Sequence, residues 1–174
     1  MITQTHCHEL FEYRDGHLYW KPKIMSRGRP SAKNGRRVGT PGGDGYLDVN
    51  INKQRYRVHR LIFLMFHGYL PEEVDHVNNQ RQDNRIENLR ASNSQTNKFN
   101  SLLSSHNTSG VKGVSLHKKT KKWRCSLSIN NRTKQVFGFQ SKEDAAEFME
   151  LWRIMAHGSF ANNGEFHRPI SVGF

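Results

Sequence analysis

Several features are scarce in this sequence of 174 residues, and each scarcity narrows the possible functions. There are only two cysteines, Cys7 and Cys125, and their spacing indicates neither a zinc site nor a disulfide framework. The longest purely apolar run, residues 61–66, is far too short to span a membrane, and no secretory signal segment opens the chain. We therefore expect a cytoplasmic protein in a reducing compartment, without a membrane partner.

Acidic residues are also few, 15 against 27 lysines and arginines, which leaves a net charge of +12. Such a surplus implies a polyanionic partner, and nucleic acid is the leading candidate. The basic residues gather in two runs without any acid, residues 21–37 and 112–134. The alternative for each run is a solvated surface or a disordered segment.

Turn residues and hydrophobic periodicity divide the chain into three regions. The first predicts short strands at residues 10–13, 18–20, 46–51 and 55–58, a long basic loop at 22–45 and a buried helix at 59–67. The second predicts a strand at 72–76 and two short helices at 84–90 and 93–99, since Asn84 with Glu87 and Ser92 with Gln95 have capping-box spacing. The third predicts strands at 113–117, 123–129 and 134–139 and a helix at 142–157.

Four polar residues of the second region can form a phosphodiester-cutting site. Asp75 offers a carboxylate oxygen and Asn97 an amide oxygen, which are ligands suited to Mg²⁺ or Mn²⁺. His76 can take a proton from water near neutral pH. Asn88 is expected to hold the loop that carries His76. His59 is more often a structural histidine than a site residue at such a position.

This region resembles the HNH, or His-Me finger, endonucleases of the phage and homing type. The matching pieces are Val74-Asp75-His76-Val77-Asn78, then Asp83-Asn84-Arg85-Ile86-Glu87-Asn88-Leu89-Arg90, then Asn97. The resemblance implies a ββα-metal fold, His76 as general base, Asn88 as the central asparagine, and Asp75 and Asn97 as metal ligands. Many HNH proteins have histidine at the last position, and asparagine there favours magnesium or manganese.

The third region resembles the apetala-type, or ethylene-response-factor, DNA-binding domain. The matching pieces are Gly110-Val111-Lys112-Gly113-Val114, Trp123, Phe137-Gly138-Phe139 and Glu143-Asp144-Ala145-Ala146. A three-stranded sheet of this kind can lie in the major groove, with lysines on flanking phosphates. The predicted DNA contacts of the whole chain are Lys112, Lys118, Lys122, Arg124 and Lys134 here, and Arg27, Arg29 and Arg36 in the basic loop.

The sequence thus predicts an α+β protein with an HNH nuclease domain at residues 1–100, a linker at 101–109, an apetala-like module at 110–160 and a tail at 161–174. Its expected activity is metal-dependent, site-selective cleavage of double-stranded DNA, encoded by a phage or bacterium. A monomer with one such site would nick, whereas a homodimer could cut both strands. The alternatives are a non-catalytic DNA-binding or regulatory protein on a nuclease fold, and a structural or RNA-binding protein.

Overall fold

The computed structural model describes residues 2–23, 31–129 and 132–164. The chain divides into two compact units, residues 1–93 and 94–174. The predicted linker, residues 101–109, lies within the second unit, as do residues 161–164 of the predicted tail. Mixed helices and small antiparallel sheets confirm the predicted α+β class.

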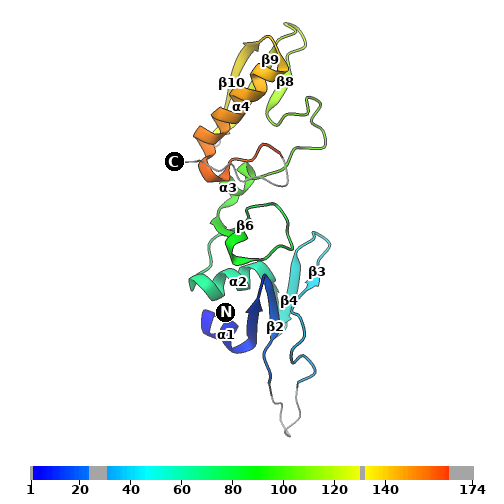
Figure 1. Ribbon diagram of the computed structural model, residues 1–174, viewed down its shortest axis with the longest axis vertical. Helices are drawn as coiled ribbons and strands as arrows, with labels where there is room; N and C mark the ends of the chain where they lie inside the picture. The colour runs from blue at the N-terminus through cyan, green and yellow to red at the C-terminus, as the bar shows by residue number, and fades with distance from the viewer. Residues whose placement is uncertain (1, 24–30, 130–131, 165–174) are drawn as a thin grey trace. The chain divides into compact units, whose positions relative to one another are not determined.

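Three small antiparallel sheets and two helices form the first unit (Figure 1). β1 pairs with β2, β4 lies between β3 and β5, and β6 pairs with β7. The elements are α1 (Gln4–Leu10), β1 (Phe11–Arg14), β2 (His17–Trp20), β3 (Thr40–Pro41), β4 (Leu47–Ile51), β5 (Gln54–Arg57), α2 (Val58–His67), β6 (Glu73–His76), the 3-10 turn η2 (Ile86–Asn88) and β7 (Leu89–Ser92).

The core of this unit forms around α2, which is buried over most of its surface because its sequence is apolar nearly all round. Phe11 and Leu18 of the first hairpin and Val74 of β6 pack in the same core. α2 ends at Gly68, which adopts the left-handed conformation and donates its N–H to the carbonyl of Leu64. The predicted helix at 59–67, ended by Gly68, is confirmed.

Two expectations for this unit were wrong. The helix predicted at residues 84–90 is only the turn η2 followed by strand β7. The physical reason is that Leu89 is buried opposite His76 in the β6–β7 ladder, so pairing of the chain overrides the local capping signal. Helix α1 was not predicted at all. Thr3 caps it by accepting a hydrogen bond from the His6 N–H, and Cys7 is its single fully buried residue.

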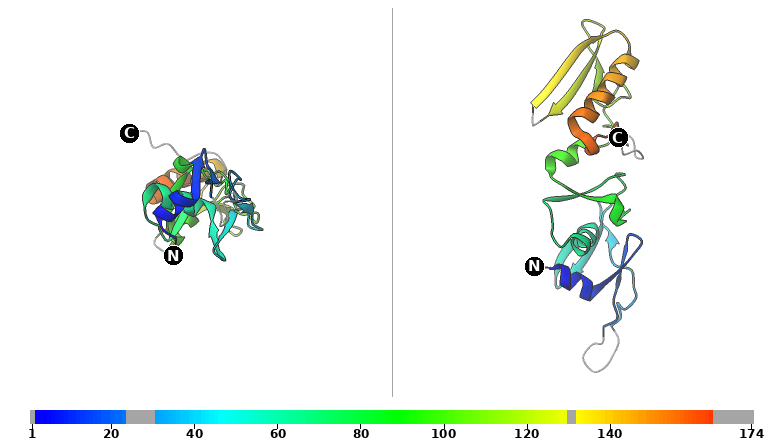
Figure 2. Two further views of the ribbon diagram at one scale, coloured as in Figure 1. Left: turned by 90° about the horizontal axis from the view of Figure 1, so that it is seen from below. Right: turned by 60° about the vertical axis from the view of Figure 1, so that its left-hand side comes forward.

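The second unit contains a short helix and a three-stranded sheet covered by a long helix. α3 (Ser94–Phe99) precedes β8 (Val114–Leu116), β9 (Trp123–Ile129), β10 (Arg132–Phe139), α4 (Lys142–His157) and the 3-10 turn η3 (Gly158–Phe160). β9 is the central strand, and α4 lies across one face of the sheet (Figure 2). These elements agree with the predicted strands and helix.

Alternation along β9 determines which face of the sheet α4 covers. Cys125 and Leu127 are buried and pack in one core with Ala145 and Met149 of α4. The helix begins at Ser141, whose Oγ accepts from the Asp144 N–H at 3.0 Å, as the capping spacing predicts. The core is small, which agrees with the low apolar content of the chain.

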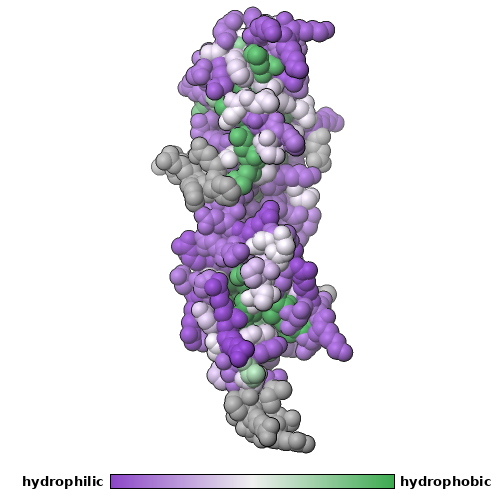
Figure 3. Space-filling model, turned by 90° about the vertical axis from the view of Figure 1, so that its right-hand side faces the viewer, coloured by the Kyte–Doolittle hydropathy of each residue, from purple (hydrophilic) through white to green (hydrophobic). Residues whose placement is uncertain are grey.

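The surface carries few hydrophobic residues. The face drawn in Figure 3 is mostly hydrophilic, with hydrophobic residues in small separate patches. Within residues 2–23, 31–129 and 132–164, no helix is long and apolar enough to cross a membrane.

Candidate active site

The candidate catalytic residues lie on the hairpin of β6 and β7. Asp75 pairs in register with Arg90, and His76, the last residue of β6, pairs with Leu89. Both side chains are withdrawn from solvent, with Asp75 6% and His76 3% exposed. Because the strand ends at His76, the chain turns at this point into the loop of residues 77–85.

One hydrogen bond fixes the orientation of His76. Its Nε2 lies 2.8 Å from the amide oxygen of Asn84, which is 1% exposed. An amide oxygen can only accept, so Nε2 carries the ring proton and Nδ1 keeps its lone pair. Burial lowers the pKa of His76 below its ordinary value, although the bond to Asn84 opposes this shift. The imidazole is therefore neutral near pH 7 and can accept a proton at Nδ1.

Asn88 holds the loop closed. Its Oδ1 accepts from the backbone N–H of Asn78 at 3.0 Å, and its Nδ2 donates to the Asn78 side chain at 2.9 Å and to the Asp83 carbonyl at 2.7 Å. The side chain is buried, so these bonds are shielded from competing water. This is the positioning contact that was expected of Asn88, and it acts on the loop between His76 and Asn84.

The N-terminal hairpin supports the same loop from outside. The hydroxyl of Tyr13 accepts from the Ile86 N–H at 3.1 Å. Gly16 has φ of +79°, and a Cβ atom at this position would lie 2.9 Å from the backbone nitrogen of Arg85. Only glycine allows so close an approach, so the first hairpin packs tightly against the segment that carries Asn84.

Asp75 forms an ion pair with Arg90. The guanidinium donates from Nε at 2.8 Å and from Nη2 at 2.7 Å, both to Oδ2 of the carboxylate. Sequence reasoning left Arg90 outside the site, and the structure places it directly on Asp75. Arg85 instead pairs with Asp83, and this guanidinium lowers the pKa of Asp83 to about 2.

A second imidazole and a tyrosine lie beside His76. The ring of His59 is 5.0 Å from that of His76, and the ring of Tyr46 is 5.0 Å from His59 and 5.8 Å from His76. The guanidiniums of Arg57 and Arg81 each lie 5.1 Å from the centre of the Tyr46 ring. His59, doubtful from the sequence, thus belongs to the surroundings of the base.

Sequence reasoning missed three residues of this neighbourhood. Asn84 was assigned to a helix cap, because Glu87 follows it at capping spacing. Tyr46 and Arg81 carry no local signal, since their proximity to His76 arises only when β4 and the hairpin loop pack together. Asn84 could have been found from its place inside the HNH-like stretch.

The donor set suits a hard divalent cation. Asp75 contributes a carboxylate, and Asn97, which is half-buried in α3 of the second unit, would contribute an amide oxygen. Across the described part of the chain, no group of three or more His, Cys, Asp or Glu residues could hold a metal by itself. Two oxygen donors would leave most of the coordination sphere to water and phosphate, as Mg²⁺ and Mn²⁺ allow. The metal pair stays a prediction.

The predicted DNA contacts fall into distinct environments. Lys118 and Lys122 are exposed on the β8–β9 connection, and Arg124 points from the face of β9 opposite α4, its Nε donating to Ser115 Oγ at 2.9 Å. Lys134 is exposed but pairs with Leu127, so its side chain lies on the α4 side of the sheet rather than on the open face. Arg36 is exposed, whereas Arg27 and Arg29 lie outside the described residues.

Lys112 has an internal position instead of an outward one. Its ammonium group donates to the carbonyls of Phe99, Ser101 and Asn162. Burial lowers its pKa to about 8. Because the ammonium is already surrounded by three carbonyls, we do not count Lys112 among the exposed DNA contacts.

The buried state of His59 predicts a pH-dependent stability. Burial, assisted by nearby His76, lowers the pKa of His59 from 6.5 to about 3. Below pH of about 6.5 the unfolded chain therefore takes up a proton that the folded chain does not, and folding stability falls as pH decreases toward 3. In His59→Leu this fall should be shallower, by up to about 1.4 kcal/mol per pH unit. Urea unfolding of both proteins between pH 7 and 4.5 measures it, and parallel stability curves would contradict the assignment.

Comparison with known proteins agrees with this geometry. Residues 56–98 match the family model described as HNH endonuclease, a range that includes His59, Asp75, His76, Asn88 and Asn97. Over 136 residues, 76% of this chain, the sequence is 30% identical to a protein of Acanthamoeba polyphaga mimivirus that is named an uncharacterised HNH endonuclease. The chain covers 66% of that relative, slightly less than two thirds of its length. No solved structure gives a significant match. The chain therefore carries, at residues 56–98, a segment that matches the HNH endonuclease family.

Proposed function

We propose that this protein is a metal-dependent DNA endonuclease that hydrolyses phosphodiester bonds with His76 as general base. The observation that carries the proposal is the environment of His76. A buried, neutral imidazole is held through Nε2 by Asn84, next to the carboxylate of Asp75, inside a segment that matches HNH endonucleases. A viral relative bearing the HNH endonuclease name supports the same activity.

Each residue of the site has a distinct task in the proposed reaction. His76 accepts the proton of the attacking water at Nδ1, because its Nε2 is occupied by Asn84. Asp75 and Asn97 would hold one Mg²⁺ or Mn²⁺, which when bound supplies neutralisation of the developing charge on the phosphate and the leaving oxygen. Arg90 holds the Asp75 carboxylate in place, and Asn88 keeps the loop from moving His76. Cleavage would leave a 5′-phosphate and a 3′-hydroxyl.

The open face of the second-unit sheet is the proposed DNA-binding surface. Arg124, Ser126, Gln135 and Phe137 share this face by register, and the exposed lysines of the β8–β9 connection border it. Phe137 is 57% exposed, which is unusual for a large hydrophobic residue without a partner surface. An arginine on a groove-facing sheet can contact a base, and flanking lysines can contact phosphates. This surface would give the enzyme site selectivity of the homing type, with one strand nicked per site.

Substitution of the proposed base tests the mechanism. In His76→Ala, cleavage of supercoiled plasmid should fall by at least about 100-fold, because no other group is placed to take the proton. Affinity for duplex DNA measured with chelator should stay nearly unchanged. His106→Ala, which removes an exposed histidine outside the site, should cleave at the parental rate. Full activity of His76→Ala would sink the mechanism.

The role of Asn84 is tested by two substitutions of similar size. Asn84→Leu lacks the acceptor oxygen and should slow single-turnover cleavage at least about tenfold, since the ring loses its orientation. Asn84→Asp keeps an acceptor and should retain most of the rate, and the DNA concentration for half-saturation should not move in either variant. Equal rate reductions in both variants, in proportion to lowered melting temperatures, would reduce Asn84 to a packing residue.

The lysines beside the open face are tested by the salt dependence of binding. Replacing Lys118 and Lys122 together with glutamine should flatten the slope of log affinity against log salt by about 0.9 for each phosphate that the lysines neutralise. Fluorescence anisotropy with a labelled duplex between 50 and 300 mM salt, on the order of one decade of concentration, is sufficient for the measurement. A slope equal to that of the parent chain would argue against phosphate binding by these residues.

A further inference from the structure

Helix α3, which carries Asn97, is too short to hold its own position. It comprises six residues, Ser94–Phe99, and isolated helices below about 12 residues are marginal in water. Its place therefore depends on the contacts that its C-terminal end makes within the second unit. Three such contacts come from segments far along the chain.

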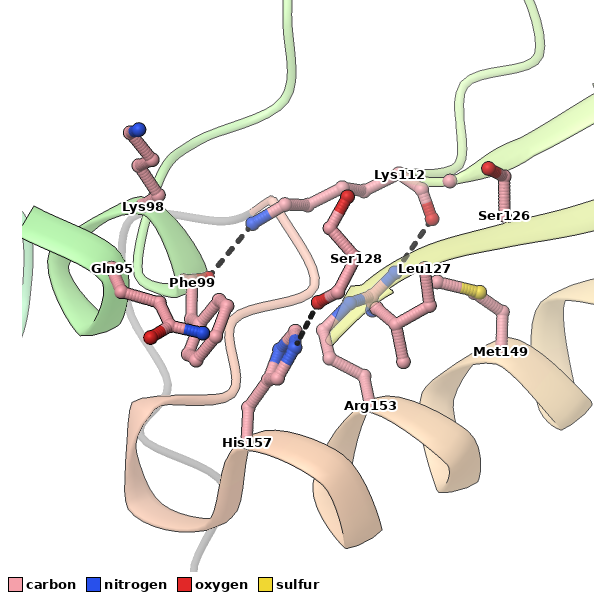
Figure 4. A pocket seen from close by; sticks show the side chains of 11 residues that line it. Gln95, Lys98, Phe99, Lys112, Ser126, Leu127, Ser128, Met149, Arg153 and His157 are labelled. Carbon is pink, nitrogen blue, oxygen red and sulfur yellow. Dashed lines mark hydrogen bonds between the residues drawn. The ribbon is translucent and has the colours of Figure 1, made fainter. Parts of the chain in front are cut away.

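The first contact is an ammonium group at the end of the helix. Lys112 Nζ donates to the carbonyl of Phe99 at 3.0 Å, to that of Ser101 at 2.5 Å and to that of Asn162 at 3.2 Å (Figure 4 shows the contact with Phe99). Carbonyls at a helix C-terminus lack partners within the helix, and a cation there also offsets the helix dipole. Arg153, 2% exposed, fixes the backbone of Lys112 in turn, since its Nη2 donates to the Lys112 carbonyl at 2.6 Å.

The second contact is a ring stack between α3 and α4. The rings of Phe99 and His157 lie 3.6 Å apart at an interplanar angle of 3°. His157 is itself held to the sheet, because its Nε2 donates to the Ser128 carbonyl at 3.1 Å. Figure 4 shows His157 at the centre of this cluster, where it lines a cavity of about 260 Å³ together with Lys112, Phe99 and Arg153.

The third contact joins the residue after the helix to the end of the described chain. Asn162 Nδ2 donates to the side chain of Asn100 at 3.3 Å, and both residues are buried. The Leu103 N–H donates to the Gly164 carbonyl at 3.3 Å. The end of α3 is therefore tied to the sheet, to α4 and to the segment after η3.

We propose that Lys112 and His157 are positioning residues for Asn97, so that the DNA-binding sheet and its helix also set the place of a metal ligand. This inference rests on the proposed function, in which Asn97 is that ligand. It assigns to the second unit a part in building the cutting site, in addition to the choice of target. Neither residue contacts the reacting atoms, so both act only through α3.

Binding of Mn²⁺ to the full chain without DNA tests the proposal independently of cleavage. Titration followed by electron paramagnetic resonance gives the dissociation constant for Lys112→Met, His157→Leu and the control Lys98→Met. Lys98 lies on the same helix, and its side chain points away from Lys112 and His157 (Figure 4). We expect the first two variants to bind Mn²⁺ about 10- to 100-fold more weakly, the range typical when a residue that orients a metal ligand is removed. The control should bind as the parent does.

Charge alone would have the opposite effect. Removing a lysine near a cation site reduces repulsion and should strengthen Mn²⁺ binding, so a weaker affinity in Lys112→Met cannot come from charge. Folding is checked by the melting temperature and by DNA affinity in chelator. If Lys112→Met does not fold, His157→Leu decides. Parental Mn²⁺ affinity in a folded variant would overturn the proposal.

Asn97→Ala separates this inference from the function on which it rests. If Asn97→Ala binds Mn²⁺ as the parent does, the assignment of Asn97 as a ligand fails, and the inference fails with it. If Asn97→Ala is weakened and the Lys112 and His157 variants are not, only the positioning fails. In the double variant Asn97→Ala with Lys112→Met, we expect no further weakening beyond that of Asn97→Ala, because the two residues act on one interaction.

Discussion

The hydrogen bond between His76 Nε2 and Asn84 Oδ1 is the interaction on which the rest of the candidate site depends. It determines which ring nitrogen keeps its lone pair, and it can form only if residues 77–85 fold back over the end of β6. Asn88 closes that loop from inside, and the hairpin of β1 and β2 supports it from outside through Tyr13 and Gly16. The small sheets of the first unit therefore serve to hold one imidazole in one orientation.

A second constraint concerns charge. Asp75 is buried, and a buried carboxylate without a partner is costly, so Arg90 accompanies it across the β6–β7 ladder. His76 and His59 are buried as well, and both remain neutral because burial lowers the pKa of each imidazole. The site thus combines a compensated carboxylate with a neutral base, which is the pairing that water activation beside a phosphate requires.

The elements with strong periodicity were predictable from sequence, and those determined by pairing at a distance were not. α2, β9 and α4 agree with prediction because their apolar residues repeat at helical or strand spacing over several turns or residues. β7 was mistaken for a helix because a local capping signal competes with a ladder to residues fifteen positions away, such as Asp75 with Arg90. The same limit applies to the site. Asp75, His76 and Asn88 were found from their spacing, whereas the bond to Asn84, the ring of Tyr46 and the inward direction of Lys112 arise only on folding.

Nicking of supercoiled plasmid by the full chain, with Mg²⁺ or Mn²⁺ and with chelator, tests the central claim most directly. The account predicts open-circular product only when the metal is present, with ends that DNA ligase reseals because they carry a 5′-phosphate and a 3′-hydroxyl. Plasmid that stays supercoiled while the protein binds it, or cleavage that persists in chelator, would contradict a metal-dependent nuclease built on His76.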